Sequence, residues 1–316
     1  MTRWQPGTDP DVLRARAELL AGIREFFAAR DVLEVETPLL CRAGITDPAI
    51  EPLLVPRGQS LDTPRFLQTS PEYAMKRLLA AGSGPIYQIA RAFRDGEAGS
   101  RHNPEFSLLE WYRPGFDHHA LMAELAQLLC HCLGERPWRG TSYRQLFLDA
   151  LGIDPFAAPA YDLEAVAREH IDAGEMEGDR DLWLELMMSH LIEPGLAGPE
   201  MVYDYPASQA ALARIGCVDG FEVGHRFEAY VDGVELANGY WELADAQEQR
   251  RRFEADNHRR RANGQESRPL DELLLAALES GLPDCAGVAL GVDRLLMLSL
   301  GVDDVRSVLA FDWERC

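Results

Sequence analysis

The chain of 316 residues carries 52 acidic and 31 basic residues, a net charge of −21 at pH 7, and 47% of its residues are hydrophobic. This length and apolar content suffice for one large core or two smaller ones. A protein that covers a long stretch of nucleic acid needs a basic surface, so the charge argues against that class. It leaves room for a small basic pocket that binds a nucleotide, and for a basic protein partner.

Cysteine usage and the first residues favour a reducing compartment. The six cysteines form no Cys-x-x-Cys pair. Cys130, His131 and Cys132 look like a metal triplet, but they lie in the apolar run 121–133, where adjacent helical side chains point in different directions, so core packing is favoured. Residues 1–7 lack an apolar signal core and no run of about 18 apolar residues occurs. We therefore expect a soluble, cytoplasmic protein without a membrane partner.

The first third of the chain predicts helices interleaved with short strands. Apolar residues recur at helical spacing after Pro10 and predict a helix to about Arg30. The elements expected next are a strand at 32–36, a proline-rich loop, a strand at 66–68, a helix at 72–81, and strands at 86–93 and 105–113. Because only a polar loop separates the last two, they predict an antiparallel hairpin.

The remaining elements follow the same mixture. A helix is expected at 118–133, and residues 141–198 indicate short helices broken by Pro and Gly, which we interpret as a helical insertion. Further predicted elements are strands at 201–205 and 221–230, a tight turn at Asp232-Gly233, a polar helix at 245–262, a helix at 270–280, and a strand from 288 that runs into a helix ending near 301.

Hairpins separate the predicted strands as often as helices do. A parallel, doubly wound sheet needs regular alternation of strand and helix, and that alternation is missing. The sequence therefore predicts an α+β fold, an antiparallel sheet flanked by helices, in a single domain over 1–316 with the insertion at 141–198.

Two arginines and two glutamates carry the first hypothesis of a site. Arg94 ends a strand beside a polar loop, and Arg294 follows Gly291 at the start of a helix. Each is a surface residue when taken alone, but guanidinium groups bind phosphate oxygens in a fixed orientation. Glu235 and Glu242 could hold Mg²⁺ against a nucleotide phosphate, although surface acids on a hairpin are the simpler reading.

The spacing of these glutamates poses a geometric problem. Residues seven apart on a regular strand point to opposite faces of the sheet. A bulge or a strand end at Asn238-Gly239 would place Glu235 and Glu242 on the same side, and we predict one of these two features there.

The remaining candidates have structural explanations of equal weight. Glu72 opens a helix and can stabilise its dipole, and Ser70 precedes it at a predicted helix cap. Tyr112 ends a strand, where aromatic residues are usually core, and His102 precedes Asn103-Pro104 in a loop. From residues alone, the sequence thus indicates no more than a possible nucleotide–Mg²⁺ site on an antiparallel sheet.

The order of several motifs resembles that of class II lysyl-tRNA synthetases over residues 12–312. Residues 26–38 resemble motif 1, the dimer-forming segment; residues 93–112, with Phe93-Arg94 and His102-Asn103-Pro104-Glu105-Phe106, resemble motif 2; Gly291-Val292-Asp293-Arg294 resembles motif 3. Residues 233–239 are similar to the metal and amino-acid segment of that family. The resemblance implies a class II synthetase-like catalytic domain that works as a homodimer.

Motif 1 lies within the first 38 residues, which leaves no room for the anticodon-binding domain of bacterial lysyl-tRNA synthetases. Residues 204–209 and 284–289 are similar to the short paralogues that ligate (R)-β-lysine to translation elongation factor P. The resemblance implies a ligase that activates (R)-β-lysine or lysine with ATP and Mg²⁺ as an aminoacyl-adenylate, and then transfers it to a lysine side chain of elongation factor P without tRNA. A truncated synthetase that charges tRNA and a silent regulatory paralogue are the alternatives.

The same resemblance assigns roles to individual residues. Arg94 and Arg294 would be the catalytic residues. Arg94 would contact the α-phosphate of ATP and the substrate carboxylate, and Arg294 would contact the γ-phosphate. The amino-acid pocket would be formed by Ser70, Pro71, Glu72, Tyr112, Glu242 and Ala289. ATP would be bound by Arg94, Asp95, Gly96, Glu97, Asn103, Glu235, Leu236, Gly291 and Arg294, and Mg²⁺ by Glu235 and Glu242.

Two positions depart from the pattern of the tRNA synthetases. The family usually has Arg-Asn-Glu where this chain has Arg94-Asp95-Gly96-Glu97, so either Glu97 replaces the adenine-side glutamate or the backbone alone contacts the base. Ala289 stands where the tRNA synthetases usually have Gly. Its methyl group would alter the amino-acid pocket, which fits a substrate with a displaced amino group.

Overall fold

The computed structural model describes residues 4–58, 63–174 and 176–316, which fall into two compact units. The first unit comprises Met1–Gly115, His131–Leu133 and Ala244–Cys316, and the second comprises Phe116–Cys130 and Gly134–Leu243. That residues 1–316 act as a single catalytic domain stays a prediction.

The first unit contains four strands of the large sheet and a small three-stranded sheet. The four strands lie in the order β1 (Leu33–Glu34), β5 (Ile86–Phe93), β6 (Glu105–Pro114) and β12 (Cys285–Gly291). Only the β1–β5 pair is parallel, and β5–β6 is the predicted antiparallel hairpin. The small sheet has the order β2 (Leu40–Cys41), β4 (Arg65–Leu67) and β3 (Leu54–Val55).

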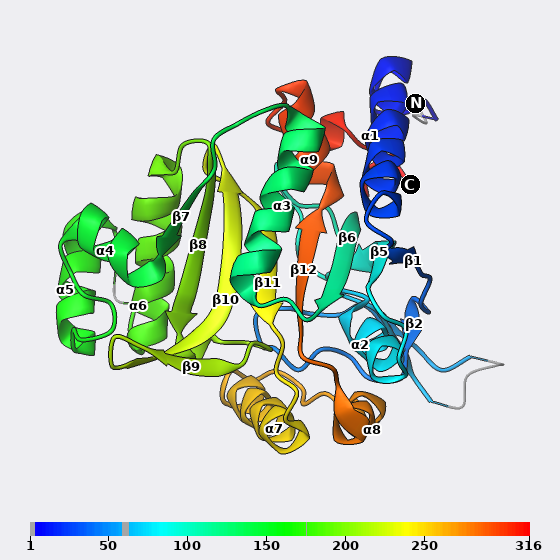
Figure 1. Cartoon of the computed structure of the whole chain (residues 1–316). Helices are drawn as coiled ribbons and strands as arrows, with labels where there is room; N and C mark the ends of the chain where they lie inside the picture. Colours follow the sequence, from blue (N-terminus) through cyan, green and yellow to red (C-terminus); the bar gives the residue numbers. More distant parts are fainter. Residues whose placement is uncertain (1–3, 59–62, 175) are drawn as a thin grey trace. The chain divides into compact units, whose positions relative to one another are not determined.

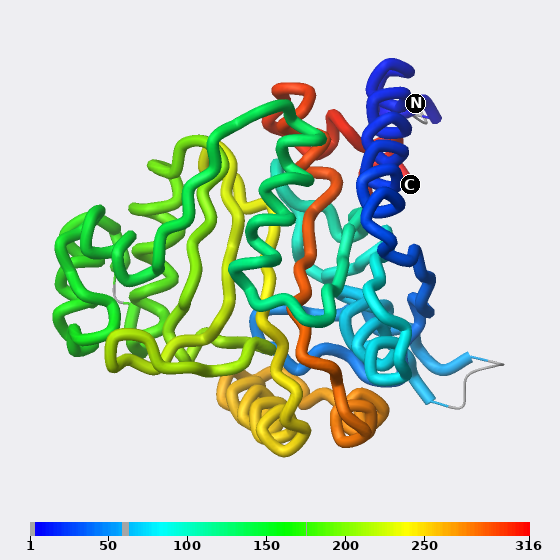
Figure 2. Tube along the Cα trace, in the orientation of Figure 1, coloured from blue at the N-terminus to red at the C-terminus, as the bar shows by residue number. Residues whose placement is uncertain are grey.

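The described part of the first unit contains the helices α1 (Pro10–Ala28), α2 (Glu72–Ala80), α7 (Ala246–Ala262), α8 (Glu272–Gly281) and α9 (Val292–Leu300). Leu296 and Met297 of α9 are buried in a cluster against which Val12 and Leu19 of α1 pack. The backbone N–H of Gly7 donates to the carbonyl of Ala310 over 2.7 Å, so the two ends of the chain lie close together (Figure 2).

The second unit is built on strands in the order β11 (Val234–Trp241), β10 (Phe221–Val231), β8 (Pro199–Pro206) and β7 (Arg139–Ser142), with β9 (Ile215–Val218) paired to β10. The β7–β8 pair is parallel and the others are antiparallel. The predicted turn between β10 and β11 is confirmed, because Asp232 and Gly233 both have positive φ angles, 51° and 71°, as a two-residue hairpin requires.

The described part of the second unit also contains most of α3 (His118–Leu133), together with α4 (Tyr143–Leu151), α5 (Ala160–His170) and α6 (Arg180–Met187). The last three occupy the segment 141–198 and lie together beside β7 and β8 (Figure 1). Phe147, Leu163 and Trp183 are buried with Val202 of β8 and Tyr230 of β10, so apolar packing joins these helices to the sheet. Short helical turns lie at Met188–Ile192, Glu193–Gly195, Ala207–Gln209 and Val305–Ser307.

The predicted antiparallel sheet with flanking helices is therefore confirmed. Within the residues that the structure describes, no helix is both long and apolar enough to cross a membrane. The predicted core position of the Cys130–Cys132 triplet is wrong in part: His131 is exposed and its ring contacts Phe26, whereas both cysteines are half-buried. The single metal-capable cluster among the described residues does not include this triplet.

Candidate active site

The β5–β6 hairpin positions Arg94 directly after the last residue of β5. The backbone N–H of Arg94 donates to the carbonyl of Pro104 over 2.9 Å, which closes the strand pair. Its guanidinium lies 5.1 Å from the centre of the Phe106 ring, and Nη1 lies 3.7 Å from Oε1 of Glu97. The buried Nε has no hydrogen-bond acceptor among the described residues. Arg94 is thus held by an aromatic face and keeps donor capacity for an anionic group such as a phosphate or carboxylate.

The loop between the two strands holds the other residues that the sequence assigns to the nucleotide. Gly96 has a φ of 79°, a conformation that glycine adopts without strain, and the N–H of Asp95 donates to the carbonyl of Glu51. Asn103 is buried, donating to the carbonyl of Glu105 over 2.6 Å and accepting from the N–H of Trp313 over 3.1 Å. These bonds show that Asn103 fixes the end of the loop.

Arg294 lies in the first turn of α9, which begins where β12 ends at Gly291. Asp293 anchors this turn, because its carboxylate accepts from the N–H of Ser107 on β6 over 2.8 Å and from Arg16 of α1 over 2.5 Å. The side chain of Arg294 reaches the β5–β6 loop, where Nη2 lies 2.6 Å from Nε2 of His102 and Nε donates to the carbonyl of Arg101. His102, taken from the sequence as a loop residue, therefore orients a predicted catalytic arginine.

Burial and then the neighbouring Arg294 lower the pKa of His102 below its usual 6.5. Glu97 opposes this shift, and Arg94 and Arg101 add to it. The imidazole is thus neutral in the folded protein at pH 7 and accepts from Arg294. Because the unfolded chain takes up this proton first, the stability that His102 contributes is lost as the pH falls below about 6.5.

We expect His102→Gln to reduce this loss of stability on acidification. The free energy of unfolding of the wild type and of the variant would be measured by urea denaturation at about pH 5.5 and about pH 7.5. The difference between the two pH values should be smaller in His102→Gln and unchanged in His170→Gln, which alters an exposed histidine on α5. Equal pH dependence in all three proteins would contradict the assignment.

A buried carboxyl, Glu110, lies among the residues that the sequence predicts for an amino-acid pocket. Glu110 lies mid-strand in β6 and is 2% exposed. Its Oε1 accepts from the hydroxyl of Tyr112 and its Oε2 from the hydroxyl of Ser70, both over 2.6 Å. Burial, followed by the charge of Glu72, raises the pKa of Glu110 to about 8. The structure therefore brings Ser70, Glu72 and Tyr112 together, as predicted, around a residue that the sequence analysis did not single out.

The start of α2 supplies the other side of this cluster. The helix begins at Glu72, as predicted, but its cap residue is Pro71 and not Ser70. Ser70 Oγ accepts from the N–H of Glu72 over 3.0 Å. Glu72 pairs with the buried ammonium of Lys76 over 2.7 Å. Lys76 was also missed, because a Lys in an amphipathic helix normally predicts an exposed face.

Strand register places Ala289 beside the same carboxyl. Glu110 of β6 has two cross-strand partners, Ala289 on β12 and Gln88 on β5. Side chains at paired positions share one face of the sheet. The first unit thus gathers Ser70, Glu72, Tyr112 and Ala289 around Glu110, on the hairpin that also carries Arg94.

The predicted irregularity at Asn238-Gly239 is wrong in its location. β11 runs through both residues, with Asn238 opposite Glu228 and Gly239 opposite Phe227 of β10. The register shifts instead between Ala229–Ala237 and Tyr230–Glu235, so Leu236 is an extra residue in β11. Asn238 does not turn the chain because its side chain accepts from Arg226 over 3.3 Å and donates to Glu228 over 3.4 Å, which ties it across the sheet.

The bulge at Leu236 nevertheless has the predicted consequence. Because Leu236 has no partner on β10, Glu235 and Glu242 are separated by six positions of the sheet and not by seven. An even separation places both carboxylates on the same face. Glu242 follows β11, pairs with Ala213, and is 1% exposed, while Glu235 is half-buried. Carboxylate oxygens are the ligands that Mg²⁺ prefers, so this donor pair fits that ion.

Comparison with known proteins identifies the family. Residues 8–315 match the family model described as tRNA synthetases class II (D, K and N). The chain belongs to this family. The β5–β6 hairpin that leads to Arg94 and the helix α9 that carries Arg294 are accordingly parts of a class II synthetase domain. Membership implies ATP as a co-substrate, typically with Mg²⁺.

Within this family, the chain is similar over nearly its whole length to proteins that share one name. A protein of Proteus mirabilis named elongation factor P–(R)-beta-lysine ligase is 50% identical over 319 residues, which cover 99% of this chain and 98% of the relative. Proteins of the same name from Mannheimia succiniciproducens and Haemophilus influenzae are 49% and 48% identical, each covering 98% of this chain and 97% and 98% of the relative. Together, the family and these relatives make the chain an enzyme of the ligase class.

Proposed function

We propose that this ligase activates (R)-β-lysine or lysine with ATP and transfers the aminoacyl group to a lysine side chain of elongation factor P. The names of relatives about half identical over nearly the whole chain support the acceptor and the amino acid. The observation that carries the proposal is the buried Glu110 cluster, because a pocket with carboxyl groups suits a substrate that bears ammonium groups.

In the first step the substrate carboxylate attacks the α-phosphorus of ATP, and pyrophosphate leaves. The carboxylate is ionised at pH 7, so this attack needs no general base. The protein must instead position the reactants and neutralise charge. Arg94 is proposed to contact the α-phosphate and the carboxylate, and Arg294 the γ-phosphate. Mg²⁺, held by Glu235 and Glu242, would neutralise further phosphate charge.

In the second step the neutral amine of an acceptor lysine attacks the acyl carbon of the adenylate. An amide bond forms, the bond from carbon to the phosphate oxygen breaks, and AMP leaves while the amine loses a proton. The remaining ATP contacts are proposed for Asp95, Gly96, Glu97, Asn103, Leu236 and Gly291. Pro71 would line the amino-acid pocket together with Ser70 and Glu72. A homodimer in the cytoplasm, where translation factors act, completes the proposal.

Pyrophosphate exchange with lysine and with (R)-β-lysine tests the first step, and mass spectrometry of purified elongation factor P tests the second. We expect exchange with at least one isomer and a mass increase on the factor that needs ATP. Exchange followed by transfer only to tRNA would favour a synthetase, and no exchange with either isomer would favour a silent paralogue. The net charge of −21 argues against a large tRNA contact.

Ala289→Gly is expected to shift substrate preference from (R)-β-lysine towards lysine. Ala289 pairs with Glu110 across the sheet, so its methyl group lies on the same face as the carboxyl that we propose for the amino-acid pocket. A single methyl group changes discrimination by about tenfold or more. The ratio of kcat/KM for the two isomers in pyrophosphate exchange measures the effect, and an unchanged ratio would refute it. Ala286→Gly, on the same strand opposite Arg113, is the matched control.

A further inference from the structure

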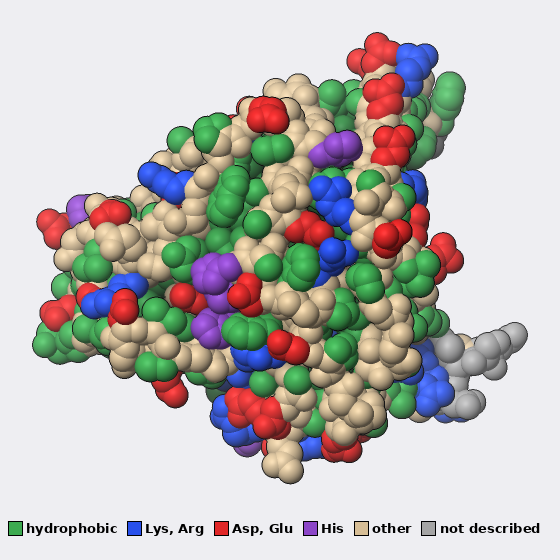
Figure 3. All heavy atoms as spheres, viewed as in Figure 1, with side chains coloured by type: hydrophobic (Ala, Val, Ile, Leu, Met, Phe, Trp, Pro, Cys, Tyr) green, Lys and Arg blue, Asp and Glu red, His purple; other side chains and the backbone are tan. Residues whose placement is uncertain are grey.

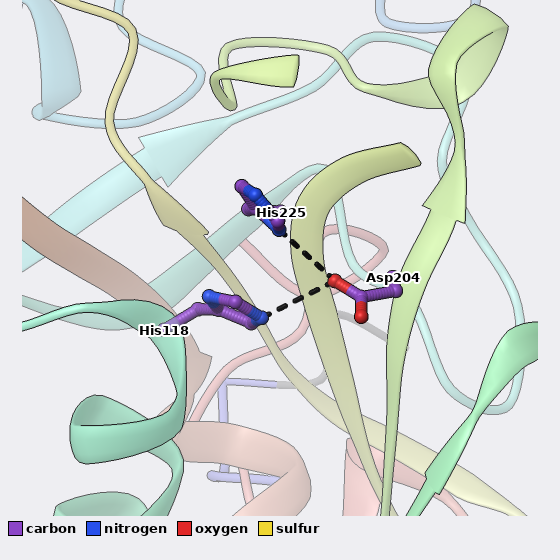
Figure 4. A group of neighbouring side chains, drawn as sticks. All are labelled: His118, Asp204 and His225. Atoms are coloured by element: carbon purple, nitrogen blue, oxygen red, sulfur yellow. Dashed lines mark hydrogen bonds and ion pairs between the residues drawn. The ribbon is translucent and has the colours of Figure 1, made fainter. Parts of the chain in front are cut away.

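Three residues of the second unit, far apart in sequence, meet at one point. His118 is the first residue of α3, Asp204 lies in β8, and His225 lies in β10. Nε2 of His118 is 3.3 Å, and Nδ1 of His225 is 3.1 Å, from the same atom, Oδ1 of Asp204. Both imidazoles point towards this carboxylate oxygen (Figure 4). The ligand atoms of the three residues all lie within 4.8 Å of one another.

The backbone is irregular where these residues meet. The β8–β10 register shifts between Gly224 and Phe227, so His225 and Arg226 face Asp204 as a bulge. Asp204 has a φ of 56°, in the left-handed region. Gly216 of β9 lies against the other edge of the His225 ring, since a Cβ at that position would be 2.2 Å from Nε2. The local fold thus aims Nδ1 of His225 at Asp204.

Burial makes this cluster unlike a surface group of charges. His118 is 3% exposed and Asp204 is 7% exposed. Nε2 of His118 approaches Asp204 outside hydrogen-bond geometry, and its Nδ1 is buried with no hydrogen-bond partner among the described residues. A buried polar atom that lacks a partner costs free energy, which a bound ion would remove for Nε2. At the surface, Figure 3 shows histidine side chains beside an acidic side chain on one face of the molecule.

The spacing fits a transition metal. Zn²⁺ binds imidazole nitrogen and carboxylate oxygen at about 2.0–2.2 Å in tetrahedral geometry, so neighbouring ligand atoms lie roughly 3.3–3.5 Å apart. The two nitrogen–oxygen distances, 3.3 Å and 3.1 Å, are close to that value. Two imidazoles with one carboxylate favour Zn²⁺ and related ions, whereas Mg²⁺ prefers oxygen ligands alone.

We propose that His118, Asp204 and His225 form a binding site for a divalent transition metal ion, with Zn²⁺ as the expected occupant. The site is additional to the Mg²⁺ proposed with ATP. Three protein ligands leave a fourth position of the tetrahedron for water or another group. An ion here links the start of α3 to β8 and β10, so it should stabilise the second unit.

Trp241 offers a local probe. Its ring lies 6.2 Å from that of His118 and 5.4 Å from that of His225, measured between ring centres. A paramagnetic ion such as Co²⁺ bound between the histidines should therefore quench Trp241 fluorescence. Trp241→Phe removes this signal without removing a ligand.

The decisive experiment titrates Zn²⁺ into the metal-stripped full-length protein in competition with a chromophoric chelator. We expect a single site whose affinity falls by more than about tenfold in His225→Gln and in Asp204→Asn, since even the loss of an outer-shell partner costs that much. His170→Gln and Cys217→Ser should bind as the wild type does. Cys217 is an exposed thiol next to Gly216 on β9, so its variant tests for binding through sulfur. Zn²⁺ should also raise the Tm of the wild type. Added Mg²⁺ should not displace the bound Zn²⁺.

The absorption spectrum of the Co²⁺-bound wild type tests the proposal even if a variant does not fold. Bound Co²⁺ should give the visible absorption of a tetrahedral nitrogen–oxygen site and should quench less fluorescence in Trp241→Phe. The proposal is overturned if the wild type shows no such spectrum, if a sulfur-to-cobalt band appears, or if folded His225→Gln and Asp204→Asn keep the affinity of the wild type. Loss of binding in Cys217→Ser alone would overturn it as well.

Discussion

Arg94→Ala is expected to lower the rate of pyrophosphate exchange by two to three orders of magnitude, about the loss seen when one pre-organised donor to a developing charge is removed. The guanidinium rests on the ring of Phe106 and pairs only loosely with Glu97, 3.7 Å away, so it adds little to the folded state. Its buried Nε has no acceptor among the described residues. The donors of Arg94 are thus available for the α-phosphate and the substrate carboxylate, and their loss should appear mainly in kcat.

Arg94→Lys separates charge from shape. Lysine keeps the positive charge but lacks the planar fork that binds two oxygens at once, so its loss should be smaller than that of alanine yet well above experimental error. Arg91→Ala is the matched control, because Arg91 lies on β5 three residues before Arg94, is half exposed, and pairs with Glu105 at 3.7 Å. The assignment fails if Arg94→Ala, with an unchanged Tm, keeps exchange within a few-fold of Arg91→Ala.

Most of the fold could be predicted because its periodic patterns are long. The helix α1, the hairpin β5–β6 and the turn at Asp232-Gly233 all lie within a few residues of their predicted positions. The strand predicted at 32–36 shrinks to Leu33–Glu34, since its pairing with β5 is parallel and very short. Short elements of this kind depend on neighbours that are distant in sequence, and no local pattern encodes them.

The β11 bulge shows a different limit of sequence reasoning. Glu235 and Glu242 are seven residues apart, so an irregularity in the strand is needed to place them on one face. The structure has this irregularity at Leu236 and not at Asn238-Gly239. An Asn-Gly pair favours a turn only when the Asn side chain is free to serve the local backbone. Here Arg226 and Glu228 bind that side chain from the adjacent strand. Side-chain pairing across the sheet therefore outweighs the local preference, and it becomes visible only in three dimensions.

Buried polar residues carry the weakest local signals in the sequence. Glu110 stands among Leu108, Leu109 and Trp111, and an acidic residue inside this apolar run is the one local signal for it. The partners that explain it lie on α2 and further along β6. The His118–Asp204–His225 cluster has no local signal, because bulged strands and a helix start bring its members together. Both sites depend on tertiary contacts that residue spacing does not reveal.

Glu110→Gln is expected to weaken binding of the lysine substrate and to abolish a proton release that accompanies it. With a pKa of about 8, raised first by burial and then by Glu72, the Glu110 carboxyl is mostly protonated at pH 7 before the substrate binds. A substrate ammonium group beside it favours the ionised form, so binding should release nearly one proton. Because a hydrogen bond to a charged group contributes about 1.5–3 kcal/mol, the variant should raise KM by roughly ten- to a hundredfold.

Calorimetric titration with lysine in two buffers of different ionisation enthalpy measures the released proton. The wild type and Glu105→Gln, a control that alters a half-exposed carboxylate at the start of β6, should show the release, and Glu110→Gln should not. The pH dependence of stability independently tests the direction of the Glu110 pKa shift. Because the folded pKa of Glu110 lies above its unfolded value of 4.5, the wild type should lose stability relative to Glu110→Gln as the pH rises from about 4.5 through about 8. A proton release that persists in Glu110→Gln would assign it to another group and remove Glu110 from the centre of the pocket.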